Sequence, residues 1–290
     1  MDVQFTAPTL QSSSMILRLS ISMYTGRKAD RKTKDEVISG KGAKSRGAAS
    51  VYKSLFAGDE DLEGVATYAA QARKRIASLT VPWGDNGDRL VSTKSFFDIS
   101  KELSSMRDEF ERRVNQFATN YHNKISNAAF ALGDLFDRKE YPDPSEITHR
   151  FGFTYSFEPV PDSGDFRVDL QNDALDSLRQ QYSKAAQTRL DNAMQDVWSR
   201  VMEETTRLRD KMILPEVGNR PRIFESTLDG FKELIGSLEA LNITNDPKLE
   251  QTRVALKNAL DPVDIASLRD SNSVRTAVKT NMQNILDKFI

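Results

Sequence analysis

The sequence predicts a mainly α-helical protein with a small β element: a long antiparallel helical hairpin, a β-ribbon or small antiparallel sheet at its tip, and a C-terminal helical bundle. Two observations predict it. Residues 93–137 and 171–212 repeat their apolar side chains at helical spacing, whereas residues 151–170 between them alternate large apolar with polar side chains. Because the 290 residues exceed one typical domain, we expect three consecutive segments, 1–60, 61–213 and 214–290.

The N-terminal segment combines a strand with a basic stretch. Apolar and polar residues alternate from Leu17 to Met23, which is typical of a half-buried strand. Residues 25–47 then hold a surplus of five positive charges, and four glycines among them indicate local mobility. The candidate basic interaction patch consists of Arg27, Lys28, Arg31, Lys32, Lys34, Lys41, Lys44 and Arg46.

Three helices and a turn are expected in the middle segment. Residues 61–79 show a short heptad, as in a coiled coil, and the turn PWGDNGDRL follows, with Trp83, Asp85 and Arg89 as a candidate surface. In the helix over 93–137 the apolar residues return every 11 positions, which predicts a nearly straight seam. The helix over 171–212 has the same period, so we expect the two to pack antiparallel.

The ribbon at 151–170 is expected to need a cover, because an isolated two-stranded ribbon is marginal in water. The strand near residue 17 is the candidate third strand. Acidic residues dominate residues 134–170, and the candidate acidic tip patch is Glu158, Asp162, Asp165 and Asp169. Beyond the prolines at 215 and 221, apolar spacing predicts helices at about 224–241, 247–260 and 271–290.

Chemistry-bearing motifs are absent from the sequence. There is no cysteine, and the two histidines lack a second ligand at metal-binding spacing. Neither a phosphate-binding glycine loop nor a nucleophile elbow occurs. No apolar run approaches the roughly 20 residues of a membrane span. We therefore expect a non-enzymatic cytoplasmic protein without catalytic residues, metal or cofactor, and without a membrane partner.

The two oppositely charged patches leave several interpretations open. Both could be ordinary solvated surface. Alternatively, the acidic tip of one molecule docks on the basic segment of the next and builds a homo-oligomer, which we prefer: a structural or adaptor protein. In another class, residues 26–46 bind DNA phosphates or block a nuclease, although only Tyr24 and Tyr52 flank them for base stacking. An enzyme whose site only the fold would reveal is a third interpretation.

Four stretches resemble a known family: TGRK at 25–28, PWGDNGDRL at 82–90, FGFTYSFEPVP at 151–161 and GDFRVDL at 164–170. They are similar to uncharacterised proteins of phage and bacterial genomes, often encoded near MoxR-type AAA+ ATPases and von Willebrand factor A proteins. The resemblance spans most of residues 15–200. It implies a phage or mobile-element origin, hence the host cytosol, and an ATPase or other phage or host partner, and it assigns no catalytic residue. Architecture alone also resembles phage host-nuclease inhibitors of the Gam type.

Overall fold

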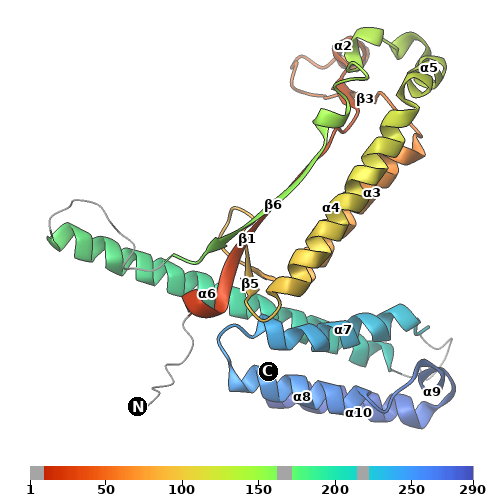
Figure 1. The fold of residues 1–290 in the computed structure, drawn as a ribbon. Helices are drawn as coiled ribbons and strands as arrows, with labels where there is room; N and C mark the ends of the chain where they lie inside the picture. The colour runs from red at the N-terminus through yellow and green to blue at the C-terminus, as the bar shows by residue number, and fades with distance from the viewer. Residues whose placement is uncertain (1–9, 162–171, 214–221, 290) are drawn as a thin grey trace. The chain divides into compact units, whose positions relative to one another are not determined.

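The computed structural model describes residues 10–161, 172–213 and 222–289, and most of these residues are helical (Figure 1). The expected class, mainly α with a small antiparallel sheet, is confirmed. The chain forms two compact units that are discontinuous in sequence. The first contains Met1–Arg18, Arg75–Ser100 and Ser156–Ile290, and the second contains Leu19–Lys74 and Lys101–Tyr155. This division differs from the three consecutive segments that we expected, because single strands and helices contribute residues to both units.

One sheet has four strands in the order β4-β5-β1-β6. Their bounds are β1 (Ser14–Ser22), β4 (Val81–Pro82), β5 (Arg89–Ser92) and β6 (Gly152–Pro159). β1 and β5 are antiparallel, with Ile16 opposite Leu90. The N-terminal strand therefore neighbours the first strand of the expected ribbon, as predicted, and covers one of its edges. The expected return strand at 164–170 lies outside the described residues.

The core of the first unit is built by five helices that follow β6. Val197, Val201 and Leu208 on the longest helix are buried in one apolar cluster with residues of the other helices. Asp246 and Asp264 begin two of the shorter helices, where each carboxylate accepts a hydrogen bond from a backbone N–H. The helices are α6 (Asn172–Lys211), α7 (Glu225–Leu241), α8 (Pro247–Leu260), α9 (Ile265–Asp270) and α10 (Asn272–Phe289).

The second unit has an aromatic core. The Phe56 ring lies 5.4 Å from that of Phe117 and 5.2 Å from that of Tyr141, both edge-on, and Phe117 lies 5.9 Å from Phe151. A two-stranded sheet pairs β2 (Arg27–Ala29) with β3 (Tyr52–Ser54). Helices in or entering this unit are α2 (Arg31–Gly40), α3 (Glu60–Leu79), α4 (Phe96–Thr119) and α5 (Tyr121–Leu132), followed by the 3₁₀ turns η1 (Gly133–Leu135), η2 (Arg138–Glu140) and η3 (Thr148–Arg150). A single turn, α1 (Leu10–Ser13), precedes β1.

The helix expected over residues 93–137 is two helices. Asn120, with φ −111° and ψ 24°, interrupts it between α4 and α5, and Gly133 ends it at φ 51°. The apolar period crosses the break without a change, because both helices place the same stripe against the same core. The helix expected over 171–212 is confirmed as α6.

The hairpin between those two long helices is not confirmed. The α6 stripe is buried with residues of α7, α8 and α10 in the first unit. On α4, by contrast, Phe110 lies 5.8 Å from Phe153 and Phe117 lies 5.4 Å from Phe56, all in the second unit. An apolar period identifies which face of a helix is buried, but it does not identify the partner that covers that face.

Within the residues that the structure describes, no helix combines the length and the apolar content that crossing a bilayer requires.

Candidate anion-binding site

The eight predicted cations lie on β2, on α2 and on the turn after α2. We call them the basic surface: Arg27, Lys28, Arg31, Lys32, Lys34, Lys41, Lys44 and Arg46. All are exposed except Lys34, which is half-buried. α2 lies wholly within the described chain and buries none of its side chains. A helix without a buried face contributes little hydrophobic free energy to folding. Packing therefore does not constrain which side chains α2 exposes to solvent.

Residues 26–46, in which the glycines led us to expect local mobility, contain a capped helix, and two of these glycines mark its end. Asp30 caps α2: the Thr33 backbone N–H donates to its Oδ1 (3.1 Å) and the Thr33 hydroxyl to its Oδ2 (2.9 Å). These hydrogen bonds lower the pKa of Asp30. Gly40 is the last helical residue, and Gly42 follows at φ 65°. Glycines in this position end a helix, which is a stop signal and not a sign of disorder.

The β2–β3 pairing places an aromatic ring beside the basic strand. Tyr52 is opposite Ala29, and its side chain is 65% exposed. The ladder ends where the Leu55 N–H donates to the Gly26 carbonyl (2.7 Å). Gly26 is at φ 61°, and a Cβ there would lie 3.2 Å from a Leu62 methyl, so only glycine fits. In the sequence Tyr52 follows the basic segment, and the pairing of β2 with β3 brings Tyr52 next to the basic strand.

The basic surface is electrostatically unpaired. None of its eight cations forms an ion pair with any residue in the described ranges. Some other cations of the second unit do have partners: Lys53 Nζ is 2.7 Å from Glu140 Oε2, and Arg113 Nε is 2.7 Å from Glu109 Oε1. Asp30, Asp35 and Glu36 of the same segment offset part of this charge without forming ion pairs in the described chain, and the surplus of five positive charges faces solvent, as at surfaces that bind anions.

A hollow of about 240 Å³ opens beside β2, and we call it the β2 pocket. It lies within the second unit. Its polar lining comes from segments far apart in sequence: Tyr24, Arg27, Lys28, Lys139, Glu140 and Arg150. Glu140 is neutralised by Lys53, whose Nζ also donates to the Leu135 carbonyl (2.7 Å). Arg150 has only Glu146 at 3.8 Å, and both side chains are more than half exposed, so that pair is weak. The lining is thus strongly cationic.

Three neighbouring tyrosines, of which Tyr24 and Tyr141 line the β2 pocket, differ in their hydrogen bonds. The Tyr141 hydroxyl donates to the Leu55 carbonyl (2.8 Å) and the Tyr121 hydroxyl to the Pro142 carbonyl (3.2 Å). The Tyr24 hydroxyl is buried and has no partner among the described residues. Burial raises the pKa of Tyr24, and the nearby Arg150 partly offsets this; burial likewise raises the pKa of Tyr141 to about 12. At neutral pH both hydroxyls therefore keep their protons, and Tyr24 can donate a hydrogen bond.

The predicted acidic tip patch is only partly visible. Glu158 is half-buried, and its Oε1 accepts a hydrogen bond from Arg18 Nη1 at 2.7 Å. That carboxylate therefore already has an ion-pair partner within the chain. Asp162, Asp165 and Asp169 lie outside the described residues.

The candidate turn surface is wrong for two of its three residues. Asp85 is exposed, but Trp83 is only 5% exposed and belongs to the core of the first unit. Arg89 Nη2 donates to the carbonyls of Ala77 (2.8 Å) and Thr80 (2.7 Å), and Arg89 Nε donates to Thr80 Oγ1 (2.9 Å). Burial lowers the pKa of Arg89 to about 10. The guanidinium satisfies carbonyls that are left unpaired at the end of α3, which is a structural role.

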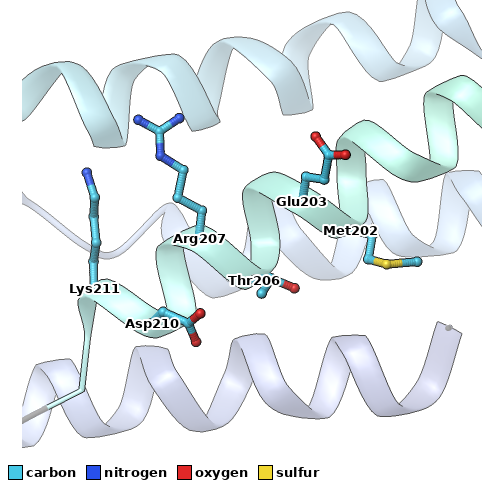
Figure 2. A pocket seen from close by; sticks show the side chains of 6 residues that line it. All are labelled: Met202, Glu203, Thr206, Arg207, Asp210 and Lys211. Carbon is cyan, nitrogen blue, oxygen red and sulfur yellow. The ribbon is translucent and has the colours of Figure 1, made fainter.

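A larger hollow, about 650 Å³, lies along the C-terminal half of α6. Figure 2 shows that its charged side chains point to different sides of the helix: Arg207 and Lys211 to one side, Asp210 to the other. The cations have partners, since Lys211 Nζ donates to Thr227 Oγ1 (2.9 Å) and Arg207 to Glu204 (3.0 Å). Balanced and divergent charges do not define a ligand, so this hollow is not the candidate site.

Metal binding has no support from the side chains that can be placed: no three His, Asp or Glu residues in the described part of the chain cluster at ligating geometry.

Of the residues that line the β2 pocket, only Arg27 and Lys28 were identified from the sequence as site residues; those that were missed include Tyr24, Lys139 and Arg150. The last two lie more than 100 residues after β2 and counted only as minor cations of an acidic region. No local pattern marks them, because only the fold brings η2 and η3 to β2.

Comparisons with family models, with curated proteins and with solved structures found no match to this chain. The resemblance to the uncharacterised phage and bacterial family therefore stays a prediction.

Proposed function

We propose that this protein is a non-enzymatic binding protein that holds the phosphate backbone of nucleic acid on its basic surface. The observation that carries the proposal is the gathering of eight cations, without ion-pair partners in the described chain, on one small module. Docking against an acidic patch of a second copy has less support, because Glu158 is already paired with Arg18 at 2.7 Å. The nucleic-acid alternative is thereby preferred to charge-driven assembly.

The chemistry of such binding follows from the side chains. Exposed lysine and arginine residues neutralise phosphates and release condensed counterions, so affinity falls steeply with salt and does not depend on base sequence. Tyr52, exposed beside the basic strand, supplies a ring on which an unpaired base can stack. The protein is therefore expected to prefer single-stranded over double-stranded nucleic acid of equal length.

The test is a quadruple variant, Arg31→Gln, Lys32→Gln, Lys41→Gln and Lys44→Gln, none of which lines the β2 pocket. Fluorescence anisotropy with a labelled oligonucleotide, repeated at several salt concentrations, gives the slope of log affinity against log salt. Each lost phosphate contact should reduce the slope by about one.

The matched control changes four exposed lysines elsewhere, none with an ion pair in the described residues: Lys74, Lys101, Lys257 and Lys279, each to Gln. It alters net charge by the same amount and should keep the wild-type slope. If both variants lose affinity equally, only net charge matters; if neither does, the basic surface does not bind nucleic acid. Either result contradicts the proposal.

Self-association is the second candidate function, and a different observation favours it. Phe130 on α5 is 94% exposed, and Leu135 in η1 is also exposed. A phenylalanine almost wholly in water, with a second exposed apolar residue five positions on in the sequence, suits a surface that a second copy covers. Light scattering at rising concentration tests this: an oligomer that Phe130→Ser dissociates supports it, and a strict monomer contradicts it. An AAA+ ATPase partner, implied by the resemblance, stays a prediction.

A further inference from the structure

We propose that the β2 pocket binds a single phosphate dianion, either free phosphate or the terminal phosphate of a nucleic-acid strand. The basic surface would hold a backbone through scattered contacts, whereas the pocket gathers donors around one group. Tyr24, Lys139 and Arg150 belong to the pocket and not to the basic surface, so the two proposals can fail separately.

Convergence of like charges is the first observation. Four cationic residues are among those that line the pocket: Arg27 and Lys28 of β2, Lys139 of η2 and Arg150 of η3. Cations that surround a small hollow repel one another, and this repulsion destabilises the unbound protein. Their approach from three segments suits an anion with oxygens on every side, which accepts hydrogen bonds from several directions at once.

Size and local compensation fit the same ligand. About 240 Å³ equals the volume of about eight waters, which accommodates a phosphate group and the atoms bonded to it. The one carboxylate in the lining, Glu140, would repel an anion if it were free. The Lys53 ammonium, 2.7 Å from Glu140 Oε2, reduces that repulsion.

The Tyr24 hydroxyl is the second observation, and it is independent of charge. It is buried in the pocket lining without a partner among the described residues, although Tyr121 and Tyr141 next to it each donate to a backbone carbonyl. A buried hydroxyl without a hydrogen bond costs free energy in the unbound protein. A phosphate oxygen in the pocket supplies the missing acceptor.

The unpaired Tyr24 hydroxyl predicts that one substitution has different effects without and with phosphate. Tyr24→Phe removes an unsatisfied hydroxyl, so without phosphate the variant should be as stable as wild type or more stable. With phosphate it should lose affinity about tenfold, the effect of a hydrogen bond to a charged group. A merely structural hydroxyl would change the stability with and without phosphate equally.

The experiment uses the full chain and inorganic phosphate at constant ionic strength, with isothermal calorimetry for affinity and thermal unfolding for stability. Phosphate should bind and raise the melting temperature, whereas chloride and acetate should not. Arg150→Gln, at an exposed position, should weaken binding about tenfold. Lys101→Gln, at an exposed cation outside both the pocket and the basic surface, should leave binding unchanged.

Two results would overturn the proposal: phosphate acts no differently from acetate, or Lys101→Gln weakens binding as much as Arg150→Gln does. A 5′-phosphorylated dinucleotide identifies the source of the phosphate. Tighter binding than free phosphate indicates a nucleic-acid terminus, and equal binding indicates the free anion. The quadruple variant of the basic surface should retain phosphate binding whether or not it binds nucleic acid, which separates this proposal from the proposed function.

Discussion

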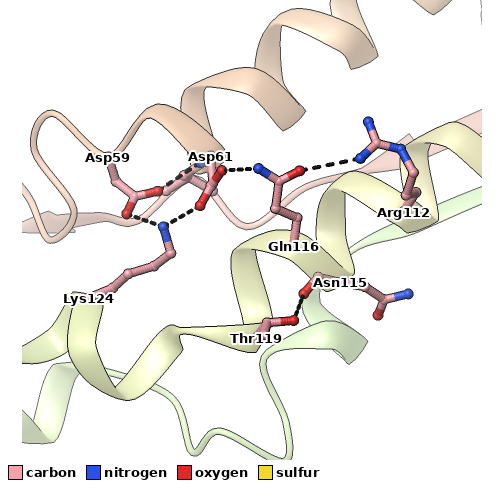
Figure 3. Close-up of polar contacts among 8 residues, drawn as sticks. Asp59, Asp61, Arg112, Asn115, Gln116, Thr119 and Lys124 are labelled. Atoms are coloured by element: carbon pink, nitrogen blue, oxygen red, sulfur yellow. Dashed lines mark hydrogen bonds and ion pairs between the residues drawn. The ribbon is translucent and has the colours of Figure 1, made fainter.

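Lys124 connects α5 to the start of α3 in the second unit, and its removal should destabilise that unit. Figure 3 shows its ammonium between two carboxylates; Nζ lies 2.6 Å from Oδ2 of Asp59 and 2.6 Å from Oδ2 of Asp61. The side chains are 12%, 13% and 27% exposed. Lys124→Met would leave two carboxylates facing each other with little water to screen them.

The magnitude follows from this burial. Removal of one partner of a buried ion pair typically costs 3–5 kcal/mol, and partial exposure of Asp61 places this case near the lower end, at about 3 kcal/mol. Burial opposes the charged form of Lys124, but hydrogen bonds to Asp59 and Asp61 outweigh it and raise the pKa of Lys124 above its ordinary 10.5. Its contribution is therefore present at neutral pH and lost only as the pH rises beyond 10.5 through the folded pKa.

Both tryptophans, Trp83 and Trp198, lie in the first unit, so their fluorescence would not report this loss. Native-state hydrogen exchange, resolved on α3 and α5, measures the free energy of opening directly. Lys101→Met, which removes an exposed lysine of α4, is the control and should change it by less than about 0.5 kcal/mol.

A triple variant, Lys124→Met with Asp59→Asn and Asp61→Asn, separates charge from packing. It removes every charge of the network, and an asparagine at 59 can still cap α3 through the acceptor that receives the Leu62 N–H (2.9 Å). Most of the lost stability should return. The reasoning is refuted if Lys124→Met costs no more than the control, or if the triple variant is less stable than the single one.

Three further predictions concern other residues. Arg89→Met should lower the free energy of unfolding by about 2–3 kcal/mol, because three hydrogen bonds at the end of α3 are lost. Urea unfolding, followed by the fluorescence of Trp83 in the same turn, measures this loss. A loss no larger than that of Arg46→Met would contradict the prediction. Hydrogen bonds from Arg112 and Arg113 lower the pKa of Glu109 from 4.5 to about 2. The stability difference between wild type and Glu109→Gln should therefore be constant above pH 5 and shrink as the pH falls towards 2. A difference that persists at pH 2 in acid unfolding curves would disprove this. Tyr52→Ala should weaken single-stranded binding about tenfold and duplex binding much less, and equal losses in anisotropy titrations would rule out stacking.

Local periodicity was sufficient to locate much of the secondary structure. The alternation near Leu17 placed β1, the aromatic alternation after residue 151 placed β6, and the apolar steps after residue 172 placed α6. Each of these patterns depends only on which side chains lie on one face of an element, and that is written in neighbouring residues. The break at Asn120 was missed because the apolar stripe continues through it in register.

The candidate site divides in the same way. The composition of residues 26–46 identified all eight cations of the basic surface, since charge density is a local property. It could not show that Asp30 caps a helix there, nor that Tyr52 lies beside the basic strand. We also predicted a surface position for Trp83, which is buried. An aromatic residue in a glycine-rich turn does not indicate from its neighbours in sequence what packs against it.

The sequence by itself determined the fold class, the faces of the helices and the position of the cations, because these depend on side chains a few residues apart. Only the tertiary structure decided which elements cover the two long apolar stripes, and only it brought Lys139 and Arg150 to Tyr24. The contacts around Tyr24 join segments separated by more than 100 residues, and those that cover the α6 stripe join it to helices that follow it in the chain. They depend on how whole elements fill a shared core, which no local pattern encodes.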